Sequence, residues 1–113
     1  MRFDELSLRD DILDALAAMH FEECTPIQEQ SIDLILEGRD LIACAQTGTG
    51  KTAAYLLPVI DLLADTEATP KVKCVIMVPT HELAQQIDRQ MEGFAYYIPV
   101  SSLAIHGGND GKE

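Results

Sequence analysis

The chain has 113 residues, of which 47% are hydrophobic and 24% are charged, a composition typical of a globular domain. Its formal net charge of -11 excludes a broad basic surface for nucleic acid, so any such contact must be local. The longest apolar runs, at 56–60 and 74–78, are much shorter than the roughly 20 residues of a membrane helix. The first residues lack the apolar core of a secretory signal, and we therefore expect a cytoplasmic protein.

Two helices are predicted in the first part of the chain. The stretch after Ser7 places apolar residues at a helical period and ends near His20. The segment Thr25-Pro26-Ile27-Gln28 begins a second helix, because threonine suits the N-cap, proline the first helical position and glutamine the third. This helix runs to about Glu37, and Gly38 closes it.

Strands alternate with helices in the rest of the chain. Short apolar runs predict strands at 41–44, 74–78 and 100–105. Helical periods predict helices over 51–63, with a kink at Pro58, and over 80–94. This alternation predicts an α/β fold in which helices flank a parallel sheet.

The three cysteines, Cys24, Cys44 and Cys74, are scattered within or beside apolar segments. An odd number at such spacing fits buried thiols better than a disulfide framework or a metal site. We therefore assign them no chemistry.

A glycine-rich segment joins the first predicted strand to the helix that follows. Its sequence, Ala45-Gln46-Thr47-Gly48-Thr49-Gly50-Lys51-Thr52, matches a P-loop except that alanine stands in place of the first glycine. Gly48 and Gly50 would let backbone N–H groups converge on phosphate oxygens. Lys51 would reach the β- and γ-phosphates of ATP, and Thr52 would offer its hydroxyl to Mg²⁺, so we expect both to serve catalysis. The alternative is a flexible turn, but the flanking strand and helix favour phosphate binding.

Several motifs resemble, in order and spacing, the N-terminal motifs of DEAD-box RNA helicases. They are Phe3, Phe21, Thr25-Pro26-Ile27-Gln28, Ala45 to Thr52, Pro79-Thr80-His81-Glu82-Leu83-Ala84-Gln85 and Gly107-Gly108. The resemblance implies that the segment from Thr25 to Gln28 reads the adenine edge through Gln28, and that Phe21 packs on the base. An amide can pair bidentately with adenine. The alternative is a helix-capping box, in which a Gln28 side chain folded back on Thr25 could not reach a base.

The resemblance also implies RNA contacts after the phosphate loop. Pro79 and Thr80 match the motif that lies along the RNA backbone, where N–H groups at a helix start and the threonine hydroxyl meet phosphates. Gly107 and Gly108 match a further motif of the RNA-binding surface. The alternatives are an ordinary strand-to-helix junction and a glycine turn.

Three residues depart from the family pattern. His81 replaces the usual arginine, and because histidine is mostly uncharged at neutral pH, we expect weaker RNA or interdomain contacts there. His20 and Cys24 stand where glycine and proline usually precede the adenine-reading segment. These two substitutions bear on the geometry of the loop that leads into Thr25.

The resemblance divides the chain at residue 37. Residues 1–37 are the adenine-reading helical segment. Residues 38–113 are the N-terminal part of a RecA-like ATP-binding domain, which stops before the Asp-Glu-Ala-Asp motif. We therefore expect part of the first RecA-like P-loop domain of an ATP-dependent RNA helicase, with ATP, Mg²⁺ and RNA as its ligands. The alternative is a non-catalytic ATP-binding module that regulates a protein partner.

The hydrolytic motifs of the family, Asp-Glu-Ala-Asp and Ser-Ala-Thr, do not occur in the chain. The acids of the first motif hold Mg²⁺ and orient the attacking water, so we expect this chain to bind nucleotide without appreciable turnover. We expect the rest of this domain and a second RecA-like domain in the intact protein. Because the family's partners for the 41–44 strand come later in sequence, we also expect the isolated chain to be marginally stable.

Overall fold

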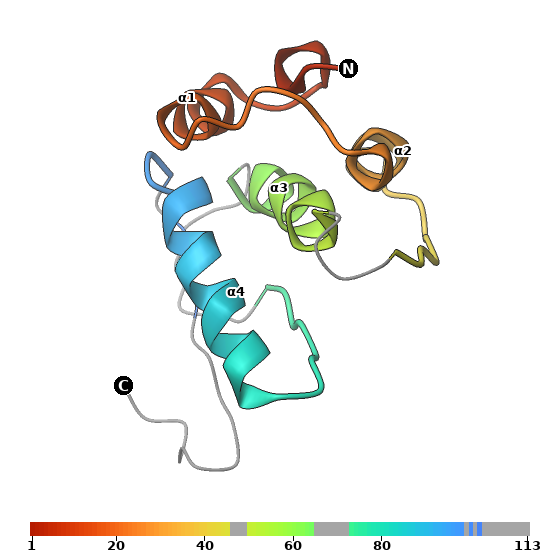
Figure 1. Cartoon of the computed structure of the whole chain (residues 1–113), viewed down its shortest axis with the longest axis vertical. Helices are drawn as coiled ribbons and strands as arrows, with labels where there is room; N and C mark the ends of the chain where they lie inside the picture. Colours follow the sequence, from red (N-terminus) through yellow and green to blue (C-terminus); the bar gives the residue numbers. More distant parts are fainter. Residues whose placement is uncertain (46–49, 65–72, 99, 101, 103–113) are drawn as a thin grey trace.

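Helices make up most of the regular structure in the part of the chain that can be described. The computed structural model describes residues 1–45, 50–64, 73–98, 100 and 102. Its elements are a 3-10 turn and four α-helices: η1 (Phe3–Glu5), α1 (Asp10–Ala18), α2 (Pro26–Leu36), α3 (Lys51–Ala64) and α4 (His81–Phe94). Figure 1 shows α3 between α2 and α4, with α1 near the C-terminal end of α4. None of these described helices is long and apolar enough to cross a lipid bilayer.

Local signals set the starts of α2 and α4, as the sequence predicts. α2 begins at Pro26, directly after the extended backbone of Thr25. α4 begins after Thr80, whose hydroxyl oxygen accepts a hydrogen bond from the backbone N–H of Leu83 at 3.2 Å. The predicted helix after the phosphate loop is also confirmed, because α3 begins at Lys51.

A Schellman motif ends α1 and turns the chain toward the second helix. The N–H of Phe21 donates to the carbonyl of Leu16 at 2.8 Å, and the N–H of His20 donates to that of Ala17 at 3.1 Å. His20 has a left-handed backbone, with φ of 64°. α2 ends in the same way, with Gly38 at the matching position and φ of 81°. The motif therefore fixes where Phe21 leaves α1.

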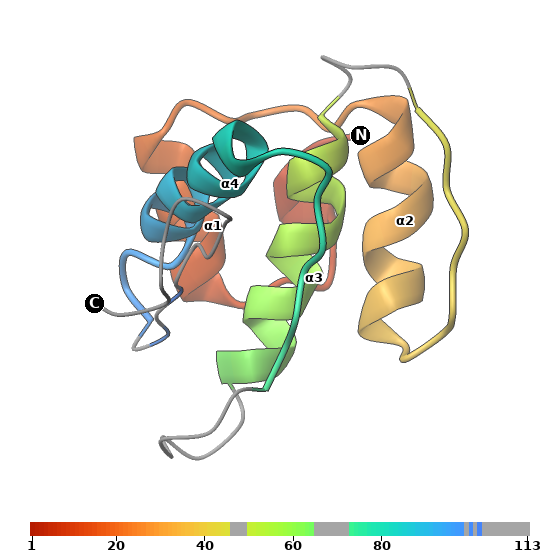
Figure 2. The same ribbon diagram turned by 90° about the horizontal axis from the view of Figure 1, so that it is seen from below.

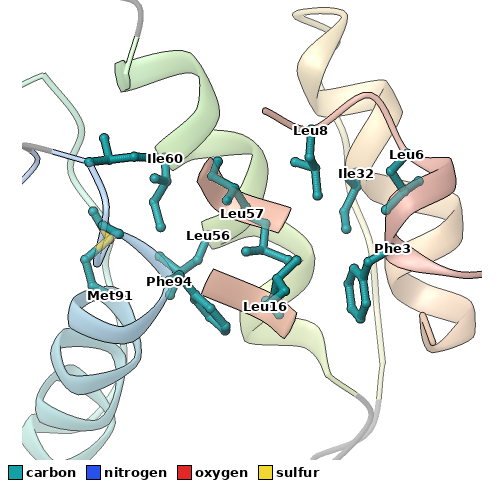
Figure 3. Packing of buried hydrophobic residues seen from close by; sticks show 14 residues of the cluster. Phe3, Leu6, Leu8, Leu16, Ile32, Leu56, Leu57, Ile60, Met91 and Phe94 are labelled. Atoms are coloured by element: carbon teal, nitrogen blue, oxygen red, sulfur yellow. The ribbon is translucent and has the colours of Figure 1, made fainter. Parts of the chain in front are cut away.

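The hydrophobic core surrounds α3. Its side chains Leu56, Leu57 and Ile60 are fully buried. Figure 2 shows α2 alongside α3, and Figure 3 shows the α3 side chains between Phe94 of α4 and Ile32 of α2. The core thus holds together helices from both sides of the phosphate loop.

The predicted strands at 41–44 and 74–78 are not formed as paired strands. Among the described residues neither segment takes part in a ladder, and the β contact there is an isolated bridge between Arg2 and Glu23. The two segments lie apart in both views (Figures 1 and 2). A strand needs a hydrogen-bonded neighbour, and in the family that the motifs resemble the neighbours come from later sequence. The predicted strand at 100–105 lies mostly outside the described residues.

The expectation of buried cysteines is wrong for two of the three. Cys44 and Cys74 are exposed, while Cys24 is half-buried. Cys44 and Cys74 belong to the two extended segments, so the absence of sheet neighbours in the described structure leaves their side chains uncovered. Burial raises the pKa of the Cys24 thiol.

Candidate functional site

The phosphate loop leads directly into α3. Gly50, Lys51 and Thr52 lie at the start of this helix, where unpaired N–H groups and the helix dipole favour an anion. The Lys51 ammonium donates a hydrogen bond to the Ala45 carbonyl at 3.2 Å, so this side chain reaches back to the residue at which the loop begins. The predicted residues Gln46, Thr47, Gly48 and Thr49 lie outside the described residues. The described ends of the loop thus present a lysine and a helix N-terminus to the same space.

Thr52 has a partner on its own helix. Its side chain forms a hydrogen bond with Tyr55, one turn further along α3. Burial raises the pKa of Tyr55, and this hydrogen bond acts in the opposite direction. The residue proposed to bind Mg²⁺ therefore lies close to a phenol of its own helix.

Gln28 joins the start of α2 to the phosphate loop. Its side chain is 3% exposed. The oxygen Oε1 accepts a hydrogen bond from the backbone N–H of Thr25 at 2.9 Å, and Nε2 donates to the carbonyl of Gly50 at 3.0 Å. The amide thus bonds the capping residue and the loop at the same time. This bond joins two residues that lie 22 positions apart in sequence. The sequence motifs alone did not predict it.

The capping box predicted as an alternative for Gln28 is present, and its two halves differ. The half made by Gln28 is a full hydrogen bond to the Thr25 N–H. In the other half, the Thr25 hydroxyl is directed toward the backbone of Gln28. Its oxygen is buried and has no partner at hydrogen-bond geometry among the described residues. At this helix start the Gln28 side chain therefore makes the side-chain hydrogen bond of the capping box, and the Thr25 hydroxyl does not.

Gly50 is required for two separate reasons. Its φ of 81° lies in the left-handed region that side chains rarely adopt. A Cβ atom added to it would lie 2.3 Å from Nε2 of Gln28 and 3.1 Å from Oγ1 of Thr25. The sequence analysis explained Gly50 by the close approach of phosphate to the backbone. The structure adds a second reason, which is that the buried Gln28 amide packs closely against Gly50.

Phe21 lies in a cluster of three aromatic rings. Its ring centroid is 6.1 Å from that of Phe3, and 5.7 Å from that of Phe94 in an edge-to-face arrangement. Phe21 is 36% exposed, whereas the other two rings are buried. The sequence motifs included Phe3 and Phe21 but missed Phe94. The apolar period of the predicted 80–94 helix places Phe94 on its buried face, but it does not indicate that Phe94 contacts Phe21.

The loop between α1 and α2 contains the two residues, His20 and Cys24, that depart from the family pattern. His20 adopts the left-handed backbone that the family's glycine would adopt easily. The N–H of Cys24 donates to the carbonyl of Met1 at 2.8 Å, a bond that a proline at this position could not make. The substitutions thus leave Phe21 and Thr25 at the two ends of an ordered loop.

The predicted RNA-contacting residues are partly described. Pro79 and Thr80 are exposed at the N-terminus of α4. His81 follows, with Nε2 3.9 Å from a carboxylate oxygen of Glu82. Gly107 and Gly108 lie outside the described residues. An exposed helix start with a capping threonine is suited to a phosphate, which is what the sequence motif implies.

Comparison with known proteins identifies the family. The model of the DEAD/DEAH box helicase family matches residues 25–113. The ATP-dependent RNA helicase CshA of Limosilactobacillus reuteri is 46% identical over 97% of this chain and 22% of its own length. CshA of Listeria monocytogenes is 45% identical over 96% of the chain and 21% of its own length. The chain therefore spans about a fifth of the length of these curated relatives.

Solved structures agree with the sequence relatives. The RNA helicase Prp28 from Chaetomium thermophilum, bound to ADP, has a TM-score of 0.86 and 36% identity, covering 96% of this chain and 27% of that one. A DEAD box protein from Methanococcus jannaschii has a TM-score of 0.81 and 35% identity, covering 96% and 30%. These likenesses confirm the predicted fold class, part of a RecA-like α/β P-loop domain. The chain belongs to the DEAD/DEAH box helicase family.

Proposed function

We propose that the chain supplies the ATP-binding site and part of the RNA-binding surface of an ATP-dependent RNA helicase. The observation that carries this proposal is the bond from Nε2 of Gln28 to the carbonyl of Gly50, at 3.0 Å. This bond brings the segment predicted to read adenine next to the end of the phosphate loop, which supports a single nucleotide site. A general P-loop would need no such amide. The ADP bound to the related Prp28 supports an adenine nucleotide as the ligand.

The residues at the start of α3 fit a nucleoside triphosphate with Mg²⁺. Backbone N–H groups would bind the phosphates, and Lys51 would exchange its bond to the Ala45 carbonyl for phosphate oxygens. Thr52 would hold Mg²⁺ through its hydroxyl, and the ion would neutralise phosphate charge. Catalysis by Lys51 and Thr52 would require the acidic motif that this chain does not contain.

Adenine recognition would use a rearranged Gln28. In the present conformation both polar ends of the amide bond the protein, to Thr25 and to Gly50. Each amide atom has a second hydrogen-bonding position, but Gln28 is 3% exposed, so its side chain would have to turn outward to reach a base. Phe21, with 36% of its surface exposed, offers a ring on which the base would stack.

RNA would meet the start of α4. The Thr80 hydroxyl, the neighbouring N–H groups and the exposed Pro79 would face the phosphate backbone, and Gly107 and Gly108 would extend this surface. The remainder of the first RecA-like domain and a second such domain would complete the helicase. The alternative of a self-contained regulatory module is not favoured, because the similar proteins are named RNA helicases.

Nucleotide binding to purified protein tests the proposal. We expect Lys51→Ala to abolish ATP binding, measured by calorimetry, because it removes the cation that faces the phosphates. We expect Gln28→Ala to weaken the preference for ATP over GTP. Gln30→Ala is the matched control, since Gln30 is an exposed glutamine of the same helix. Equal affinity of the parent protein for ATP and GTP would contradict adenine reading.

Activity needs the full-length protein. We expect it to hydrolyse ATP faster in the presence of RNA and to separate short RNA duplexes, while residues 1–113 alone bind ATP with no appreciable turnover. A full-length protein that binds ATP yet neither hydrolyses it nor remodels RNA would support the regulatory module instead.

A further inference from the structure

The ring of Phe21 has neighbours that fix its orientation. Phe94 meets it edge to face, with 85° between the two ring planes, and Phe3 meets it at a tilt of 48°. Phe94 is 1% exposed, so its own ring has little room to move. The rest of Phe21 is open to solvent, and the residue as a whole is 36% exposed. One buried ring thus holds a partly exposed ring in a defined position.

Phe94 comes from a different part of the sequence than the adenine-reading segment. It is the last residue of α4, and Figure 1 shows this end of α4 beside α1. The preceding residue, Gly93, also lies close to α1: a Cβ added to it would be 3.0 Å from Cε of Met19, which caps α1. Figure 3 shows the Phe94 ring beside Leu16 of α1. The packing of α4 against α1 therefore places Phe94 next to Phe21.

We propose that Phe94 is a positioning residue for the nucleobase, which holds the ring of Phe21 in the orientation that stacks on the base. This inference rests on the proposed function, since it assumes that Phe21 receives a base. A ring held in place before the ligand arrives loses less conformational freedom on binding. An edge-to-face pair adds a directional attraction that an aliphatic side chain does not provide.

The contribution of Phe94 has a measurable size. The attraction of an aromatic pair and the ordering of one side chain each correspond to a few-fold change in an equilibrium constant. We therefore expect Phe94→Leu to weaken ATP binding about three- to tenfold in the full-length protein. Leucine keeps the site apolar and removes the aromatic ring. Met91→Leu is the matched control, because Met91 is a buried residue of the same helix with no ring.

A ligand without a base separates positioning from general damage. Inorganic tripolyphosphate would occupy the phosphate loop but would not touch Phe21. We expect Phe94→Leu to leave its affinity unchanged while ATP affinity falls. Loss of both affinities by the same factor would overturn the proposal, because it would indicate a structural defect of the whole site. An equal loss of ATP affinity in Met91→Leu would overturn it too.

A double-mutant cycle tests whether Phe94 acts through Phe21. We expect Phe94→Leu to have no further effect on ATP affinity once Phe21 is replaced by alanine. Additive effects would overturn the proposal. The outcome is separate from that of the proposed function, which fails if the parent protein binds neither ATP nor tripolyphosphate. Normal ATP binding with unchanged affinity in Phe94→Leu would reject only the role of Phe94.

Discussion

His20 holds a left-handed backbone that a side chain makes unfavourable. With φ of 64°, it ends α1 in the same hydrogen-bonding motif in which Gly38 ends α2. We expect His20→Gly to raise the free energy of unfolding by about 1 kcal/mol, because glycine adopts this conformation without steric strain. Urea unfolding of the domain that carries the chain, followed by circular dichroism, measures the change.

Gly38 supplies the reciprocal control for His20. A Cβ at Gly38 meets no atom within 4 Å, so Gly38→Ala tests backbone strain without a clash. We expect it to lower the free energy of unfolding by about 1 kcal/mol. A destabilising effect of His20→Gly would mean that the histidine side chain makes contacts worth more than the strain.

The site residues show which contacts a sequence can predict. The pairing of Thr25 with Gln28 was predictable, since both partners lie in the first turn of one helix. The bond from Gln28 to Gly50 was not, because it depends on how α2 packs against α3. Phe94 was missed for the same reason. Its partner Phe21 is brought near by the packing of α1 and α4, and no local pattern encodes that packing.

At the scale of elements, a buried carboxylate of α3 forms a hydrogen bond with the start of α1. Asp61 of α3 is 8% exposed, and its Oδ2 accepts a hydrogen bond from the backbone N–H of Arg9 at 2.8 Å. Arg9 is the N-cap of α1. We expect Asp61→Ala to lower the free energy of unfolding by about 1–3 kcal/mol, because it deprives a partly buried donor of its acceptor. Thermal and urea unfolding both measure this loss.

Asp61→Asn is the matched variant, since its amide oxygen can still accept from Arg9. We expect a smaller loss of stability than for alanine. Equal losses in the two variants would show that the negative charge, rather than this hydrogen bond, supports the helix pair.

Helices and strands differ in how far the sequence predicts them. In the described part of the chain, four helices form close to where the apolar period, the caps and the glycine signals place them, because their hydrogen bonds are local. The first of them begins at Asp10, with Arg9 rather than Ser7 as its N-cap. The segments 41–44 and 74–78 have strand composition but form no ladder with any other described residues, because a strand depends on a neighbour from another part of a chain. The fold class was predictable from the alternation and the motifs, whereas the pairing was not.

Across the whole molecule, the unpaired segments leave large apolar side chains in water. Ile42 is 96% exposed, Met77 is 90% exposed and Val75 is 76% exposed. Extended segments with such side chains are templates for association. We expect residues 1–113 to associate as concentration rises, and the pair Ile42→Lys and Met77→Lys to reduce this association. Light scattering across micromolar concentrations measures the effect.

Tyr97→Lys provides the comparison for association. Tyr97 is 53% exposed but follows α4 rather than lying in either extended segment. We expect it to leave association nearly unchanged. If it suppresses association as strongly as the other two substitutions, the effect comes from added charge and not from the segments.

The aromatic cluster also gives the molecule a place for an optical reporter. The chain contains no tryptophan, so Phe21→Trp would introduce the sole indole into these residues. Its ring would rest against Phe3 and Phe94, with the rest of its surface in contact with water. A base stacking on that surface would change the fluorescence. The arrival and departure of a nucleotide could then be timed directly, separately from any chemistry at the phosphates.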